Sequence, residues 1–191
     1  DDFRNMFLLI QEMITSKDIL AIHDISDGGL ITTLLEMCFT KKIGMNLNLS
    51  GIDRVIENLF SEESGFVVQV KQKDVAKIVT TFSQKGLVVR EIAYLTNDIF
   101  SISKDDKEIF SKSIIELEKI WRETSHAIQS LRDNKETANS ELSLLDDNSF
   151  SGLSSNVNFD ESQIKHLSIK STNPKVAILR EQGVNGQNEM A

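Results

Sequence analysis

Cysteine and proline each occur only once in this chain of 191 residues. The single cysteine, Cys38, excludes a scaffold held by disulfides, and it also excludes a metal site built from several cysteines. No apolar run approaches the roughly 18 residues of a membrane span, and the first residues lack the basic and apolar stretches of a signal peptide. We therefore expect a cytoplasmic protein that does not contact a membrane.

Basic residues are neither abundant nor clustered. The chain has 21 Lys and Arg residues against 29 Asp and Glu residues, so its formal net charge is −8. A nucleic acid backbone is bound by dense groups of basic side chains, and we therefore expect no nucleic acid partner. Apolar residues make up 40% and charged residues 26% of the chain, which is typical of a globular protein with a core.

Hydrophobic periodicity predicts helices and strands over the first 134 residues. Helices are expected at residues 3–16, 30–38, 55–60, 74–82 and 109–132, and strands at residues 18–22, 45–49, 66–70, 87–95 and 99–103. The last helix carries a line of apolar residues along one side, here called its apolar seam. This pattern fits either a coiled coil or a helix that packs along a sheet, and we favour the helix that packs along a sheet. The fold class expected is α+β, with a mixed sheet covered mainly on one face by helices.

The composition changes after Asn134 and again at Pro174. Residues 135–173 are rich in serine and poor in large apolar residues, so we expect an extended or poorly ordered linker. The pattern of a buried strand follows at residues 175–180, and then a glycine-containing loop and the start of a helix. We interpret residues 174–191 as the truncated βα corner of an α/β domain, residues 1–134 as a separate domain, and the chain as a fragment.

The strongest candidate site is the motif HDISDGGL at residues 23–30, between a predicted strand and a predicted helix. Its two glycines allow a ligand to approach the backbone, and the start of a helix favours an anion. The carboxylates of Asp24 and Asp27 would repel a phosphate unless a cation lay between them. Mg²⁺ binds carboxylate and phosphate oxygens together. With the hydroxyl of Ser26, the motif supports the hypothesis of a magnesium–nucleotide or phosphate site.

Each candidate residue also has a simpler interpretation. Asp27 is suited to cap a helix, and paired glycines often form a turn, so the spacing alone favours a turn. His23 fits a general base or a histidine hydrogen-bonded at the end of a strand. Glu62 and Glu63 fit ligands or a solvated acidic turn. Cys38 lies on the apolar face of its helix, where a buried and inert thiol is expected.

Four segments, taken in order, resemble the phosphoribosylformylglycinamidine synthase family in its large single-chain bacterial type. This family belongs to the aminoimidazole ribonucleotide synthetase superfamily. The segments are HDISDGGL at 23–30, FSEESG at 60–65, the helix with WRETS at 121–125 and LRDN at 131–134, and PKVAILREQGVN at 174–185. They cover nearly the whole chain apart from the serine-rich linker.

The resemblance implies part of an ATP-dependent, glutamine-using ligase of purine biosynthesis, which converts formylglycinamide ribonucleotide to formylglycinamidine ribonucleotide. Residues 1–134 would be the C-terminal domain of the second synthetase-like half, and residues 174–191 the start of the glutamine amidotransferase domain. Asp24 would be a magnesium ligand and Ser26 a nucleotide contact, so the cofactors implied are Mg²⁺ and ATP or ADP.

The same resemblance places no catalytic residue in this chain. Its implied partners are the remaining domains of the same polypeptide, which would complete a composite site for ATP and formylglycinamide ribonucleotide. A composite site needs all of its positioned groups. We therefore expect the fragment alone to be inactive.

Two alternatives remain beside this interpretation. The chain fits a non-catalytic binding or association module in which the motif at residues 23–30 is only a turn. It also fits another member of the same ATP-binding superfamily, such as a selenophosphate-synthetase-like or hydrogenase-maturation protein. The glutaminase-like residues 174–185 argue against this second alternative.

Overall fold

The computed structural model describes residues 2–147, 149–150, 152–160, 162, 175–183 and 185–190. The chain divides into two compact units, residues 1–150 and residues 151–191. The expectations for residues 163–173, Pro174 and Val184 lie outside the described residues.

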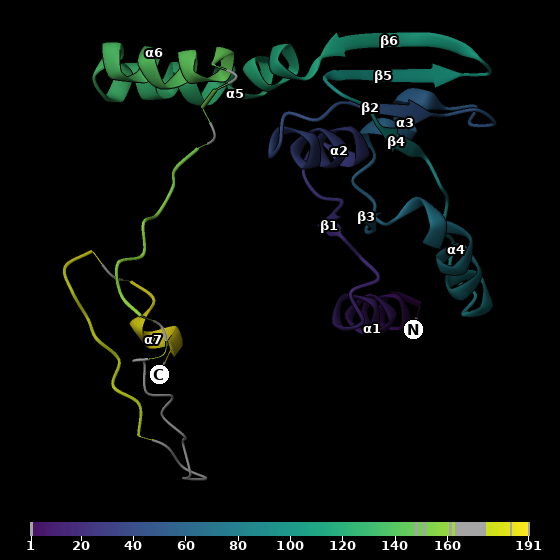
Figure 1. Cartoon of the computed structure of the whole chain (residues 1–191), viewed down its shortest axis with the longest axis horizontal. Coiled ribbons are helices and arrows are strands. Elements are labelled where there is room, and N and C mark those ends of the chain that lie inside the picture. Colours follow the sequence, from purple (N-terminus) through teal and green to yellow (C-terminus); the bar gives the residue numbers. More distant parts are fainter. Residues whose placement is uncertain are drawn as a thin grey trace. The chain divides into compact units, whose positions relative to one another are not determined.

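Helices and strands alternate from α1 to β4, and the strands β5 and β6 and the helices α5 and α6 then follow (Figure 1). The α-helices are α1 (Asp2–Thr15), α2 (Gly29–Phe39), α3 (Val55–Phe60), α4 (Val75–Gln84), α5 (Ile114–Arg132) and α6 (Lys135–Ser143). Two short 3-10 helices are η1 (Gln72–Asp74) and η2 (Leu144–Asp146). The strands are β1 (Ala21–Asp24), β2 (Met45–Asn48), β3 (Phe66–Gln69), β4 (Ala93–Leu95), β5 (Ile99–Lys104) and β6 (Lys107–Ser113).

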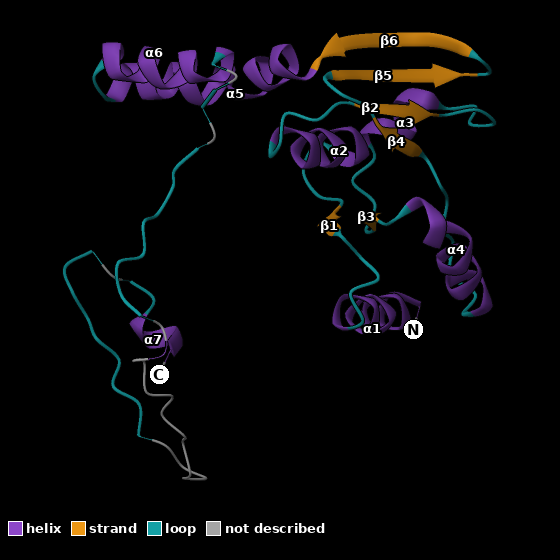
Figure 2. Ribbon diagram, in the orientation of Figure 1, coloured by secondary structure: helices purple, strands orange, loops and turns teal. Residues whose placement is uncertain are grey.

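The strands form two sheets (Figure 2). The larger sheet has the order β4-β2-β5-β6, in which β2 and β5 are parallel and the other neighbours are antiparallel. The smaller sheet is the antiparallel pair β1-β3, in which Asp24 lies opposite Phe66. The predicted α+β fold with a mixed sheet is therefore confirmed.

Two hydrophobic clusters stabilise this unit. The main cluster joins α2 and α5 to the larger sheet, and its buried members are Leu34, Cys38, Met45, Leu47, Leu49, Leu59, Phe100, Ile102, Ile114 and Leu117. The second cluster joins α1 to α4, through the buried residues Leu9, Ile10, Met13, Ile78 and Phe82. The strands β1 and β3 lie between them, because Ile22 and Phe66 pack on the second cluster and Val67 packs on the main one.

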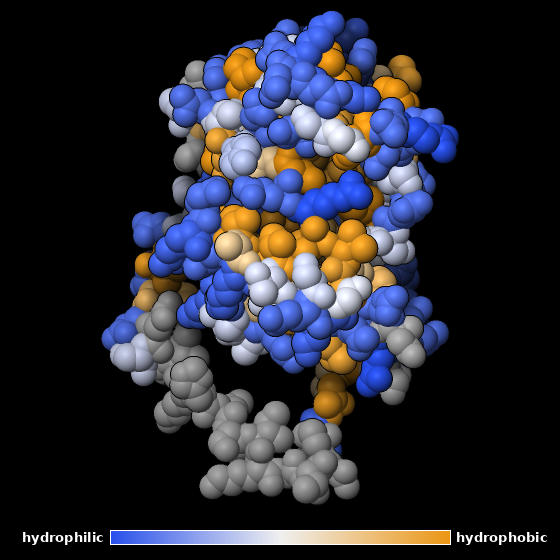
Figure 3. All heavy atoms as spheres, turned by 90° about the vertical axis from the view of Figure 1, so that its right-hand side faces the viewer, coloured by the Kyte–Doolittle hydropathy of each residue, from blue (hydrophilic) through white to orange (hydrophobic). Residues whose placement is uncertain are grey.

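Some of the apolar surface stays exposed. Phe7 and Ile14 are 45% and 42% exposed, although they lie three residues before and four residues after the buried Ile10 in α1 and so share a face with it. The reason is that α1 packs through the neighbouring face, which carries Leu9 and Met13. On the side of the molecule shown in Figure 3, apolar side chains gather across the middle, with hydrophilic side chains above and below them.

The prediction of a helix from residue 109 is wrong for its first turn. Residues 107–113 form β6, which pairs with β5 so that Ile102 lies opposite Phe110. The two strands are joined by Asp105 and Asp106, both with positive φ, as in the tight turns of β-hairpins. Asparagine and glycine usually mark such a turn, so a pair of aspartates conceals it. The helix α5 then starts after Ser113, which forms a capping box with Glu116.

The apolar seam of α5 is buried only along its first half. Ile114 and Leu117 are buried in the main cluster, and Trp121 packs on Phe39 of α2 with ring centroids 5.6 Å apart. Farther along, Leu131 is 90% exposed. The helix therefore packs into the domain at its start, as expected, and extends beyond the core at its end.

The expectation of an extended linker from residue 135 is wrong for residues 135–146, which form α6 and η2. The side chain of Asn134 accepts a hydrogen bond from the amide of Thr137 and caps α6. Ala138 and Leu145 are buried, and Lys119 of α5 forms an ion pair with Asp146. A cap and two buried apolar residues are enough to dock a short helix on α5. Residues 152–158 carry no helix or strand.

In the second unit, the strand predicted at residues 175–180 is not formed. A strand is stabilised by hydrogen bonds to a neighbouring strand, and no strand within the described residues pairs with this segment. The expected helix start is present as α7 (Gln187–Met190). The assignment of residues 174–191 to a glutamine amidotransferase domain, and the domain boundaries, stay predictions.

None of the described helices has the length and apolar character needed to cross a membrane.

From the packing of α2 we predict how the thiol of Cys38 reacts. Cys38 is 2% exposed, and burial raises the pKa of its thiol to about 11. The thiolate is the reactive form, so at pH 8 we expect the native chain to react with an aromatic disulfide reagent about a hundredfold more slowly than the denatured chain. Absorbance of the released thiolate measures both rates. Rapid stoichiometric labelling of the native chain would contradict this packing.

Candidate functional site

The motif at residues 23–30 connects β1 to α2, as the sequence predicts. Its first part is held by β1, which ends at Asp24, and by the amide of Ile25, which donates a 2.9 Å hydrogen bond to the carbonyl of Gly65. Its second part turns into the helix, where the amide of Gly29 donates to the carbonyl of Ser26. The polar residues of the motif therefore lie on a short loop fixed at both ends.

The two glycines of the motif have left-handed backbone conformations, with φ of 82° at Gly28 and 73° at Gly29. A Cβ atom added to Gly29 would lie 2.6 Å from the carbonyl carbon of Phe60 and 2.7 Å from the oxygen of Ser61. Both contacts are with backbone, which cannot move aside as a side chain would. The start of α2 thus packs directly on the end of α3, and only glycine fits there.

The residue at the helix cap differs from the sequence-based expectation. The N-cap of α2 is Gly28, which has no side chain with which to cap the helix. Asp27 is exposed and makes no side-chain hydrogen bond within the described residues. The interpretation of Asp27 as the capping residue is therefore wrong, because the second left-handed residue moves the start of the helix one position later.

Glu62 bonds the amide of the N-cap residue itself, as a glutamate of the first helical turn does in a capping box. Its Oε1 accepts a 2.9 Å hydrogen bond from the amide of Gly28. A carboxylate is favourable near the start of a helix, where amide groups are unpaired and the dipole is positive. The neighbouring Glu63 is exposed and makes no side-chain hydrogen bond within the described part of the chain. Of the two glutamates, Glu62 therefore belongs to the site.

His23 links the end of β1 to α2. Its Nε2 lies 3.0 Å from Oε2 of Glu36, and its Nδ1 lies 2.8 Å from the carbonyl oxygen of Asp24. This arrangement fits the simpler interpretation of a histidine hydrogen-bonded at the end of a strand. The hydroxyl oxygen of Thr33, a residue that is 2% exposed, lies 3.2 Å from the carbonyl oxygens of both Asp24 and Gly29, which share its one proton.

Thr33 and Glu36 were missed by the sequence analysis. They lie three residues apart in α2, so they share a face of the helix, and this face meets the end of β1 through His23 and Asp24. The spacing is visible in the sequence, but the partner of that face becomes known only from the packing of α2 on β1.

The two residues predicted to bind ligands keep their side chains accessible. The side chain of Asp24 is 66% exposed, with Oδ1 3.5 Å from Nδ1 of His23. Ser26 is exposed, and within the described residues its hydroxyl makes no hydrogen bond. The main chain around them is fixed by Ile25, Gly28 and Thr33. The loop therefore presents a carboxylate and a hydroxyl to solvent from a fixed backbone.

The described residues do not form a metal site by themselves. They contain no group of three or more His, Cys, Asp and Glu side chains arranged to hold a metal ion. A magnesium ion keeps several waters and binds through one or two carboxylates and substrate phosphates. Asp24 fits such an ion as one oxygen ligand, with the other ligands coming from phosphate, from water or from outside the described residues.

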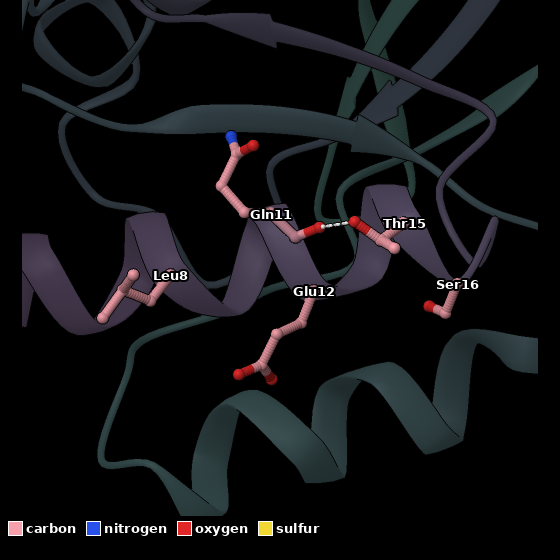
Figure 4. A pocket seen from close by; sticks show the side chains of 5 residues that line it. All are labelled: Leu8, Gln11, Glu12, Thr15 and Ser16. Atoms are coloured by element: carbon pink, nitrogen blue, oxygen red, sulfur yellow. Dashed lines mark hydrogen bonds between the residues drawn. The ribbon is translucent and has the colours of Figure 1, made fainter. Parts of the chain in front are cut away.

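Two hollows lie near α1, and only one of them touches the motif. The first, of about 220 Å³, has Asp24 and His23 at its edge and otherwise a mostly apolar lining of Phe7, Ile10, Gln11, Ile14, Ile22 and Phe66. The second, of about 480 Å³, is lined by Leu8, Gln11, Glu12, Thr15 and Ser16 (Figure 4). Ser26 lines neither hollow. The exposed loop, rather than a closed pocket, is the candidate site.

Comparison with known proteins gives a family for this chain and relatives that match most or all of its length. The family model described as the C-terminal domain of AIR synthase related proteins matches residues 3–103. The phosphoribosylformylglycinamidine synthase of Schizosaccharomyces pombe is 39% identical over 198 residues, which cover 100% of this chain and 15% of the relative. The enzyme of the same name from Saccharomyces cerevisiae is 39% identical over 96% of this chain and 14% of its own length. The chain thus spans about a seventh of these relatives.

A solved structure shares the fold. PurL from Thermotoga maritima, complexed with ATP, matches 54% of this chain and 19% of its own chain, with a TM-score of 0.50 and 14% sequence identity. At this identity the likeness concerns the fold alone.

From the contact of Gly29 with α3 we predict how substitution of this glycine changes the free energy of unfolding. Gly51 has a similar φ of 76° but no atom near its added Cβ, so it is a matched control. We expect Gly51→Ala to lower the free energy of unfolding by about 1–2 kcal/mol, which is the cost of the left-handed backbone. Gly29→Ala should lower the free energy of unfolding by about 1–3 kcal/mol more than Gly51→Ala does, because the added methyl group overlaps backbone atoms. Denaturant unfolding measures both, and equal losses would contradict the close contact.

Proposed function

Because this chain belongs to the family of the C-terminal domain of AIR synthase related proteins, we propose that it is part of a phosphoribosylformylglycinamidine synthase. In this proposal residues 1–134 are the C-terminal domain of the second synthetase-like half. Residues 135–173 connect it to residues 174–191, the start of a glutamine amidotransferase domain. The observation that carries the proposal is the likeness to the two yeast synthases, which are each 39% identical over 100% and 96% of this chain.

The proposed enzyme is an ATP-dependent, glutamine-using ligase of purine biosynthesis. It replaces the amide oxygen of formylglycinamide ribonucleotide by nitrogen from glutamine. ATP activates this oxygen, which leaves as phosphate, and the products are formylglycinamidine ribonucleotide, ADP, phosphate and glutamate. The partners of this chain are then the remaining domains of the same polypeptide, in the cytoplasm.

Within this enzyme the role proposed for the chain is to hold a magnesium–nucleotide. Asp24 supplies a carboxylate oxygen to Mg²⁺, and Ser26 supplies a hydroxyl to the nucleotide. Both side chains are accessible while their backbone is fixed, which is the geometry that a preorganised binding loop requires. When bound, the ion neutralises phosphate charge beside the acidic residues of the loop.

The chain alone is expected to be inactive, and the full polypeptide that carries it is expected to be active. The described residues offer no complete metal site, and catalysis needs all reacting groups in position. We expect the full polypeptide to form formylglycinamidine ribonucleotide from formylglycinamide ribonucleotide, ATP and glutamine, as detected by mass spectrometry. Product formation by the chain alone, or none by the full polypeptide, would contradict the proposal.

A second prediction concerns Asp24. In the full polypeptide, we expect Asp24→Asn to weaken magnesium-dependent ADP binding by at least about tenfold, because a charged ligand of the ion is lost. The control is Asp53→Asn, since Asp53 is also exposed but lies outside the motif. Titration calorimetry with and without Mg²⁺ measures the affinities. Equal affinities for both variants would remove Asp24 from the site and favour a binding module whose loop is only a turn.

A further inference from the structure

Two segments far apart in sequence lie against each other along the candidate site. The amide of Ile25 donates to the carbonyl of Gly65 at one end, and the amide of Gly28 donates to Oε1 of Glu62 at the other. Beside the second contact, Gly29 touches the backbone at the end of α3. The segment at residues 60–65 is therefore a support that follows the loop from Ile25 to Gly29.

The contact of Glu62 differs from the others because a side chain makes it. The Ile25–Gly65 bond joins two backbone groups, and the contact of Gly29 is with backbone. The carboxylate of Glu62 reaches across 34 positions of sequence to an amide that α2 itself does not use. Of the contacts that residues 60–65 make with the loop, it is therefore the one that a side-chain substitution removes while the backbone contacts stay.

The two proposed ligand-binding residues depend on this support to different degrees. Asp24 is held within β1, where it pairs with Phe66, and its carbonyl accepts from Thr33. Ser26 lies outside the strand, between the hydrogen bonds of Ile25 and Gly28. Removal of the Gly28 amide bond would loosen the loop on the helix side of Ser26, where the bond from the amide of Gly29 to the carbonyl of Ser26 remains, and would leave Asp24 in place.

We propose that Glu62 is a positioning residue for the nucleotide, which holds Gly28 and so fixes the backbone that carries Ser26. This inference rests on the proposed function, since it assumes that Ser26 contacts the nucleotide. Glu62 does not touch the ligand in this account. Its effect on affinity passes through Ser26 and leaves the metal ligand Asp24 unchanged.

The test uses the full polypeptide with three substitutions. Glu62→Ala removes the acceptor, Glu62→Gln keeps a side-chain oxygen that accepts from Gly28, and Glu63→Ala is the matched control. We expect Glu62→Ala to weaken magnesium–ADP binding about tenfold and to speed hydrogen exchange of the amides at residues 26–29 by a similar factor. Glu62→Gln should stay within about threefold of wild type, and Glu63→Ala should not differ from it.

A double-mutant cycle separates positioning from general destabilisation. If Glu62 acts through Ser26, then Glu62→Ala adds no further loss of affinity to a Ser26→Ala variant. Additive losses would overturn the proposal, and so would unchanged exchange of the Gly28 amide in Glu62→Ala. Failure of the wild-type polypeptide to bind magnesium–ADP would instead overturn the proposed function and this role with it, whatever the exchange rates show.

Discussion

The close approach of Gly29 to the end of α3 is the constraint on which the candidate site depends. A strand can turn directly into α2 only because two successive residues adopt left-handed conformations. The first turn of α2 then lies against the carbonyl groups of Phe60 and Ser61, with no room for a Cβ atom. This contact brings Glu62 within reach of Gly28. The two motifs that are separate in sequence are thus parts of one structure.

Hydrophobic periodicity predicted the helices and strands that bury one face. It missed the helices and strands whose position depends on a turn or a cap. The helix α2 and the strands β2 and β5 follow their patterns because most of their apolar residues enter the main cluster. The strand β6 was missed because Phe110 continues the four-residue spacing of the following helix, and because Asp105 and Asp106 do not look like a hairpin turn. Pairing with β5 then outweighs the helical pattern.

The candidate site was only partly predictable for a similar reason. The motif showed where a strand meets a helix, and the structure has that junction. The contacts of Thr33, Glu36 and Glu62 join segments that the chain brings together only by folding. No local pattern specifies such partners. The same limit explains Asp27, which has the chemistry of a capping residue but lies one position before the cap.

The arrangement of the two hydrophobic clusters has a mechanical consequence for the loop. The helix α2 is embedded in the main cluster, whereas Ile22 of β1 packs on the cluster formed by α1 and α4. Residues 25–28 are therefore one of the places where the chain passes from one cluster to the other, and residues 60–65 are another. These two crossings are bonded to each other through Ile25 and Gly65 and through Gly28 and Glu62, so the hydrogen bonds of the loop also fasten the two clusters together.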